Sequence, residues 1–159
     1  MIINNKLKLK KIIDSAKKAG KTVLIKRGVF DIIHPGHIFA ISLFNKLADV
    51  VIILVQSDKV VNKRKGPSRP INNQKQRALV IDGLKGVDYT YLDKSDDRKK
   101  YIAFLKYLRP TILAMTAVDP QKTKDYSGYS WQVKEFPDKK KPGFSTTEII
   151  NKVLTKYKN

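Results

Sequence analysis

The sequence contains no cysteine and only two histidines among its 159 residues. Without cysteine the chain forms no disulfide and offers no thiolate to a metal ion, which fits a reducing compartment. A zinc site needs at least three protein ligands, and two histidines leave only carboxylates to complete the set. We therefore expect no metal ion held by protein ligands alone.

Long apolar runs are also missing. No stretch of about 18 consecutive apolar residues occurs, and this excludes a membrane-spanning helix. The first residues, MIINNKLKLKKII, alternate lysine with isoleucine and leucine. They lack the continuous apolar segment and the small-residue cleavage site of a signal peptide. We expect a soluble, cytoplasmic protein that has no membrane partner.

Acidic residues are few: 14 aspartates and glutamates face 33 lysines and arginines, for a net charge of +19. Such a balance favours anionic partners, whether nucleotides, phosphorylated metabolites, nucleic acid or an anionic membrane surface. Charge alone does not choose among them, because many lysines also serve as a solvated surface. Nucleic acid is the less favoured partner, since no alternation of aromatic and basic residues indicates a stacking surface.

Apolar periodicity changes along the chain in a regular order, with helical and strand patterns alternating. This alternation predicts an α/β fold: a Rossmann-like, doubly wound parallel sheet of about five strands with flanking helices. We expect a single domain over residues 1–159, with an N-terminal helix in residues 1–20 and a Rossmann-like core in residues 21–157. The segment DKVVNKRKGPSRP is expected to be a polar connection. Strands are predicted at residues 22–30, 50–57, 87–92, 111–116 and 131–136, and helices at residues 6–19, 34–48, 72–84, 96–108 and 146–157.

Both histidines lie in the stretch GVFDIIHPGH, where the first predicted strand ends and its helix begins. Free backbone amides and the helix dipole make this position an anion site. Gly28 allows a turn, and Gly36 allows a phosphate to approach the helix start. His34 and His37 are three residues apart, so both side chains can face the same space. An imidazole donates a hydrogen bond and becomes a cation when a phosphate raises its pKa, which suits charge that develops at phosphorus.

GVFDIIHPGH resembles the GxFDxxHxGH signature of the cytidylyltransferase-like nucleotidyltransferases, which share a HIGH box with class I aminoacyl-tRNA synthetases. Synthetases are much longer and carry a KMSKS loop, whereas this chain has GFSTTE late in its sequence. The stretch PGFSTTEII instead resembles the family's STT motif, about 110 residues after HPGH. By this resemblance Ser145, Thr146 and Thr147 hold the triphosphate at a helix N-terminus. A capping box with Glu148 also accounts for Ser145 without any ligand.

The stretch from QSDKVVNKRKGPSRP to QKQRALVIDGLKGVD is similar to a segment of bacterial adenylyltransferases that make ADP-activated heptose. That resemblance implies that Lys63, Arg64 and Lys65 supply positive charge to the triphosphate or to a sugar phosphate. Arg69 would act through a bidentate fork.

Three positions depart from the family's pattern. Lys26 and Arg27 precede the first glycine, where relatives often have a small polar residue. We expect this difference to change the contacts between the protein and the sugar of the nucleotide. After the fourth predicted strand the chain reads MTAVDP, which matches the family only at Asp119 and changes the loop that shapes the acceptor site. Lys140 is the nearest basic residue where glycerol-phosphate relatives have an arginine before STT.

The resemblance implies a nucleotidyltransferase that moves a nucleoside monophosphate from a triphosphate, ATP first and CTP as the alternative, to a sugar phosphate such as D-glycero-D-manno-heptose 1-phosphate. Glycerol 3-phosphate and flavin mononucleotide are alternative acceptors, and a non-catalytic nucleic-acid-binding domain is an alternative of another class. Mg²⁺ would be bound through the substrate phosphates, and a homodimer is expected. The expected catalytic residues are His34, His37 and Lys65, and the expected nucleotide-binding residues are Gly28, Val29, Phe30, Gly36, Lys63, Arg64, Asp119, Lys140, Ser145, Thr146 and Thr147.

Overall fold

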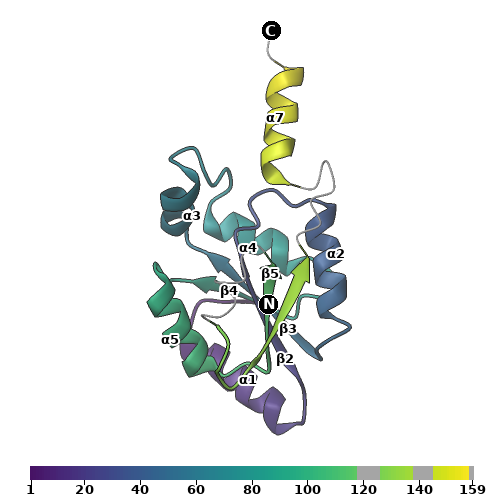
Figure 1. The fold of residues 1–159 in the computed structure, drawn as a ribbon, viewed down its shortest axis with the longest axis vertical. Coiled ribbons are helices and arrows are strands. Elements are labelled where there is room, and N and C mark those ends of the chain that lie inside the picture. Colours follow the sequence, from purple (N-terminus) through teal and green to yellow (C-terminus); the bar gives the residue numbers. More distant parts are fainter. Residues whose placement is uncertain (118–125, 138–144, 158–159) are drawn as a thin grey trace.

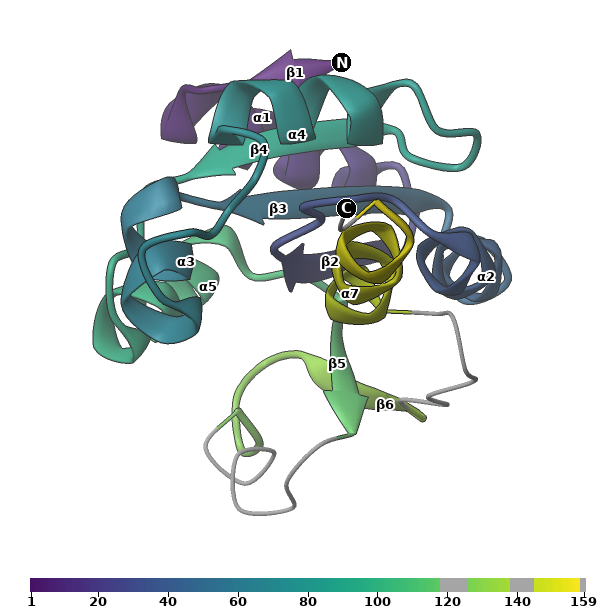
Figure 2. The same ribbon diagram turned by 90° about the horizontal axis from the view of Figure 1, so that it is seen from above.

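The computed structural model describes residues 1–117, 126–137 and 145–157. Their centre is a six-stranded sheet in the order β1-β4-β3-β2-β5-β6, in which every neighbouring pair is parallel (Figures 1 and 2). The strands are β1 (Ile2–Ile3), β2 (Val23–Gly28), β3 (Val50–Gln56), β4 (Tyr89–Asp93), β5 (Ile112–Ala117) and β6 (Gln132–Pro137). The helices are α1 (Lys6–Lys18), α2 (Pro35–Phe44), α3 (Asp58–Lys65), α4 (Gln74–Asp82), α5 (Arg98–Leu108) and α7 (Thr146–Lys156).

The α/β prediction is confirmed, with two additions. The sixth strand is β1, whose two residues pair with Thr90 and Tyr91 of β4. A strand this short shows no alternation that a sequence pattern could reveal. The segment predicted to be a polar connection contains the helix α3. This helix is mostly exposed, and Val61 is its buried residue. Tertiary position, rather than an apolar stripe, defines this helix.

Apolar side chains form one core on each face of the sheet. One cluster joins β2 residues such as Ile25 to α1 and α5 through Leu9, Ile13 and Leu105. The other joins Leu24 of β2 to α2 and α4. All seven residues of β3 are buried, as expected for a parallel strand covered on both faces. Helices thus cover both faces of a doubly wound sheet.

Local signals set the ends of several helices. Asp97 accepts a hydrogen bond from the Lys100 amide at 2.7 Å and begins α5. This helix ends at Leu108, where Arg109 takes a left-handed conformation before Pro110. Ser145 and Glu148 form the predicted capping box of α7. These ends place the loops, and with them the polar side chains, at the edges of the sheet.

The strand order reverses beside β2, which lies between β3 and β5. In such sheets ligands bind outside the carboxyl ends of the strands, at the point of reversal. The stretch GVFDIIHPGH therefore leaves the sheet at the position where a ligand site is expected. Within the described part of the chain, no helix is both long and apolar enough to cross a membrane.

Candidate nucleotide site

A cavity of about 800 Å³ lies at the carboxyl ends of β2 and β5. Its wall includes the end of β2, the first turns of α2, the end of α3 and the start of α7. Four basic side chains and one carboxylate face it. Apolar side chains from α2 and Phe136 of β6 form another part of the wall. The cavity thus offers a positive region beside an apolar one.

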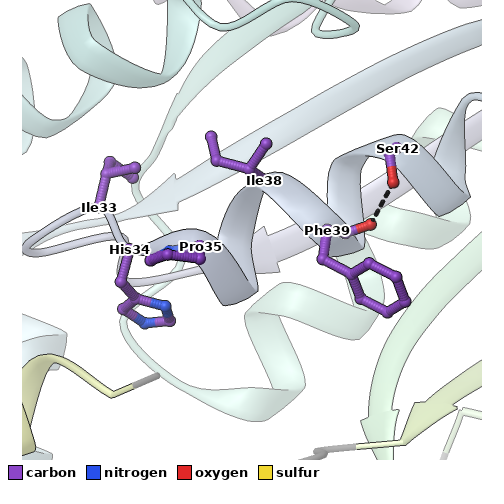
Figure 3. Close-up of a pocket in the computed structure, with 6 residues that line it drawn as sticks. All are labelled: Ile33, His34, Pro35, Ile38, Phe39 and Ser42. Carbon is purple, nitrogen blue, oxygen red and sulfur yellow. Dashed lines mark hydrogen bonds between the residues drawn. The ribbon is translucent and has the colours of Figure 1, made fainter. Parts of the chain in front are cut away.

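The two imidazoles lie stacked at this cavity. The ring centroids of His34 and His37 are 3.7 Å apart, with an angle of 28° between the ring planes. Both residues line the cavity, as the spacing in the sequence predicts. Figure 3 shows the rings of His34 and Phe39 on one side of α2, and Ile33 and Ile38 on the other, beside a shallow apolar groove. His34 lines both this groove and the larger cavity.

His37 is held as a neutral imidazole. Burial, and after it the nearby charges of His34, Lys26 and Lys65, together lower the pKa of His37 to about 3. The His34 amide donates a hydrogen bond of 3.4 Å to Nδ1 of His37. Because Nδ1 accepts, the proton of the neutral ring is on Nε2, where it can be donated to an anion. A bound phosphate would favour the protonated form of this ring.

Gly28 is required by the side chain of Phe30, two residues further along the chain. A Cβ atom at Gly28 would lie 2.5 Å from Cε2 of Phe30, far inside van der Waals contact. Phe30 itself has a positive φ of 54° and is buried, with its ring centroid 5.2 Å from that of His37. The glycine thus lets the aromatic ring support the imidazole, in addition to keeping the end of β2 free of a side chain.

A buried carboxylate ties the histidine loop to the segment after α3. Asp31 accepts hydrogen bonds from the amides of Ile71 at 2.8 Å and Asn72 at 3.1 Å, and it pairs with Nε of Arg69 at 2.6 Å. Burial would raise the pKa of Asp31, but these amides and Arg69 outweigh it and lower the pKa. Arg69, expected at a phosphate, therefore directs its Nε to Asp31.

Arg77 of α4 also stabilises the histidine loop, through hydrogen bonds. Its side chain is fully buried and donates to the carbonyl oxygens of Val29, Gln56 (2.7 Å) and Asn72 (2.9 Å). It also pairs with Asp58 at 2.7 Å. Since these partners come from the loop after β2, the end of β3 and the approach to α4, one guanidinium holds three segments together.

The basic wall comes from β2 and α3. Lys26 donates a hydrogen bond of 2.8 Å to the hydroxyl of Thr116 on β5. Lys65 lies near other cations: desolvation lowers its pKa, and Arg69 and Arg64 lower it further. Arg64 and Lys65 line the cavity, whereas Lys63, on the same helix, does not. The role expected for Lys63 stays a prediction.

The STT stretch meets the same cavity from α7. Ser145, Thr146 and Thr147 all line it. The Thr146 hydroxyl donates a hydrogen bond of 3.2 Å to the Ile32 carbonyl, so the start of α7 is tied to the histidine loop. Two helix N-termini, of α2 and α7, therefore meet at one cavity, and their dipoles favour a polyanion there.

Most residues expected at the site come together in the structure. Asp119 and Lys140 lie outside the described residues. Sequence reasoning assigned no role to Asp31, although it stands within the quoted GVFDIIHPGH, nor to Gln56, Thr116 and Phe136. Their positions at strand ends are the signal that could have found the last three. The expected residues that line the cavity are Gly28, Val29, Phe30, His34, Gly36, His37, Arg64, Lys65, Ser145, Thr146 and Thr147.

A parallel sheet with a basic cavity at its point of reversal, flanked by two helix N-termini, defines a protein that binds nucleotide phosphates. Comparison with known proteins identifies the kind. Residues 25–152 match the family described as Cytidylyltransferase-like, so the chain belongs to this family. It is a nucleotidyltransferase.

Individual relatives agree with this assignment. The chain is 34% identical over 155 residues to the bifunctional protein HldE of Salmonella arizonae, covering 92% of this chain and 31% of that protein. It is 34% identical over 141 residues to the bifunctional protein HldE of Campylobacter fetus, covering 86% of this chain and 29% of the relative. The chain thus spans about a third of the length of these curated relatives.

Solved structures show the same fold. A lipopolysaccharide core biosynthesis protein from Thermoplasma volcanium has 25% identity and a TM-score of 0.59, over 74% of this chain and 97% of that one. A pantoate-beta-alanine ligase from Francisella tularensis, solved with beta-gamma ATP and beta-alanine, has 17% identity and a TM-score of 0.63, over 98% of this chain and 78% of that one. The second similarity concerns the fold alone.

Proposed function

We propose that the protein transfers a nucleoside monophosphate, with ATP as the preferred donor, to a sugar phosphate such as D-glycero-D-manno-heptose 1-phosphate and releases pyrophosphate. The observation that carries this proposal is the stacked pair His34 and His37 at a cavity that Lys65 and the STT residues also line. The resemblance of the segment around KGPSRP to adenylyltransferases of ADP-heptose synthesis supports the choice of base and acceptor.

In the proposed reaction an oxygen of the acceptor phosphate attacks the α-phosphorus. The bond from the α-phosphorus to the oxygen bridging the α- and β-phosphates breaks, and pyrophosphate leaves with that oxygen. The attacking oxygen is already anionic, so no general base is required. Catalysis then depends on position and charge, which phosphoryl-group transfer uses extensively.

The residues at the cavity divide this work. His37 donates from Nε2 to a non-bridging oxygen of the α-phosphate, with the His34 ring stacked on it. Lys65 neutralises charge that develops on the leaving group, and Ser145 to Thr147 hold the pyrophosphate at the start of α7. The apolar part of the wall, which includes Phe136, accommodates the base.

The protein oxygens at the cavity fit an ion that is bound mainly through substrate. Asp31 is the carboxylate in the described lining, and it is occupied by Arg69 and two backbone amides. Within the described residues no group of three histidine, cysteine, aspartate or glutamate side chains could hold a metal. The other oxygens of the lining include the neutral hydroxyls of the STT stretch and the Gln56 amide oxygen, which already accepts a hydrogen bond from Arg64. Mg²⁺, when bound with the triphosphate, supplies charge neutralisation.

The test is pyrophosphate release from each nucleoside triphosphate, with Mg²⁺ and a panel of acceptors. The panel contains sugar 1-phosphates, glycerol 3-phosphate and flavin mononucleotide, so the alternative acceptors are outcomes of the same experiment. Lys65→Ala should lose most of the activity, whereas Lys59→Ala, on the same helix but away from the cavity, should retain it. No release from any pair by the folded protein would reject the proposal.

A second measurement addresses the non-catalytic alternative. Binding to nucleic acid should weaken steeply with salt, because it depends on displaced counterions. A nucleotide held in the cavity should keep most of its affinity at 0.3 M salt.

We also propose that the protein is a homodimer, because α7 extends away from the sheet (Figure 1) and the side chains of Val153, Leu154 and Tyr157 are exposed. We propose in addition that it acts in the cytoplasm.

A further inference from the structure

Two basic groups stand on opposite faces of the sheet at the end of β2. Successive residues of a strand point to opposite faces. Leu24 belongs to the core that contains α2, and Ile25 to the core that contains α5. By this alternation Lys26 lies on the face of α2 and the histidines, and Arg27 on the face of α5.

Arg27 is held firmly on that second face. Its Nε donates to Asp93 at 2.6 Å, and its Nη2 donates to the Ser95 carbonyl at 2.6 Å. The guanidinium carbon lies 4.4 Å from the ring centroid of Tyr101, a buried residue of α5. Only 13% of the Arg27 side chain is exposed, and the residue lines the cavity. Two of five guanidinium donors have these partners, so the remaining ones can serve a ligand.

Arg64 approaches from α3 to the same place. Its Nη2 donates to Oε1 of Gln56 at 3.1 Å, and Gln56 stands opposite Asp93 in the sheet. Arg27 and Arg64 line the same cavity; desolvation lowers the pKa of Arg64, and the charge of Arg27 lowers it further. Within residues 1–117, 126–137 and 145–157 no carboxylate forms an ion pair with Arg64. The nearby Asp93 is paired with Arg27. The pair of arginines therefore carries more positive charge than the carboxylates beside it balance.

The proposed function assigns the triphosphate on the α2 face to His37, Lys65 and the STT residues. Arg27 and Arg64 are thereby left for a second ligand, and for Arg64 this selects the sugar phosphate of the two ligands that the sequence resemblance implies. Both arginines line the same cavity, and they meet it across Gly28, which has no side chain to separate two ligands. In-line displacement requires the attacking and leaving oxygens on opposite sides of the α-phosphorus. With pyrophosphate held at α7, the attacking oxygen must come from the other side.

We infer that Arg27 and Arg64 form the subsite for the acceptor, which they hold by the phosphate monoester that attacks the nucleotide. This inference rests on the proposed function and adds the side of the sheet from which the acceptor enters. A phosphate monoester carries nearly two negative charges and several acceptor oxygens, matching two guanidiniums that each bind through a planar fork. A carboxylate acceptor, with one charge, would satisfy the pair poorly.

The test uses Arg64→Gln and Arg27→Lys, with Lys59→Ala as a control that removes a charge from α3 outside the cavity. Steady-state kinetics should show a KM for the acceptor raised about 10- to 100-fold in Arg64→Gln, the loss of a charge-assisted hydrogen bond. The KM for the triphosphate should change less than about twofold. Arg27→Lys keeps the charge but loses the fork, so it should also raise the acceptor KM.

A second readout does not require turnover. Inorganic phosphate is titrated calorimetrically into each protein, in the presence of an α,β-methylene triphosphate that occupies the nucleotide site. Phosphate should bind the wild type and Lys59→Ala alike and bind both arginine variants more weakly. Arg64 lies on the surface of a short helix, so Arg64→Gln should keep the wild-type circular dichroism and thermal midpoint.

The inference is wrong if both arginine variants bind phosphate as the wild type does, or if they raise the KM for the triphosphate instead. A wild type that releases no pyrophosphate with any substrate pair would reject the proposed function. The phosphate titration, repeated without the analogue, would still decide whether Arg27 and Arg64 form an anion site.

Discussion

The neutral state of His37 makes the stability of the protein depend on pH. A histidine that is neutral in the native state and has an ordinary pKa in the unfolded chain favours unfolding when the pH falls, because the unfolded chain binds the additional proton. With pKa values of about 3 in the native state and 6.5 in the unfolded chain, the free energy of unfolding should fall by about 2 kcal/mol between pH 7.5 and pH 5. The loss should continue down to about pH 3.

Urea unfolding followed by the fluorescence of Trp131 measures this loss. The matched variant is His37→Asn, whose amide oxygen can accept the His34 amide as Nδ1 does, but which does not titrate. Its free energy of unfolding should fall by about 2 kcal/mol less than that of the wild type over the same range. The lowered pKa of Asp31 acts below pH 4 and does not enter this window. Equal pH dependence in the two proteins would show that His37 is not held neutral by its surroundings.

Three further predictions follow from the cavity and its supports. His37→Ala should fold normally and reduce kcat by about 100- to 1000-fold, or about 3 to 4 kcal/mol of barrier, measured as pyrophosphate release at saturating substrates; near-wild-type turnover would contradict its role. Arg77→Met should lower the free energy of unfolding by about 3 kcal/mol, because it leaves three carbonyl groups without their donors and removes the partner of Asp58; a urea midpoint unchanged from that of Lys75→Met would contradict this. Leu154→Lys, at a side chain that is 57% exposed on α7, should convert the expected dimer to a monomer in light scattering, and a monomeric wild type would reject the dimer.

The fold was largely predictable because its signals are local. β3 has a continuous apolar run, and the capping box of α7 is visible as Ser145 and Glu148. β1 escaped prediction because two residues carry no period, and its pairing with Thr90 depends on contacts distant in the chain. α3 escaped prediction because six of its eight residues are polar, and the two adjacent valines of DKVVNKRK show no helical period that would distinguish an exposed helix from a loop.

The site was predictable where residues adjacent in sequence also act together. His34 and His37 belong to one helical turn, so their spacing was sufficient. The position of Arg27 depends on Asp93 and Tyr101, which come from β4 and α5, and no local pattern reveals these contacts. Arg69 was expected at a phosphate because a guanidinium binds phosphate well. The sequence does not show that the Asp31 carboxylate lies beside Arg69 and pairs with it. Selectivity for an anion and internal pairing use the same chemistry, and only tertiary structure separates them.

The bond between Asp31 and Arg69 has a mechanical consequence. It joins the loop that carries the two histidines to the chain just beyond the basic end of α3. Both Asp31 and Arg69 are buried. A shift of α3 when an anion arrives would therefore pull on the imidazole loop as well. With the proposed substrates, this bond would couple the donor and acceptor halves of the cavity through the protein.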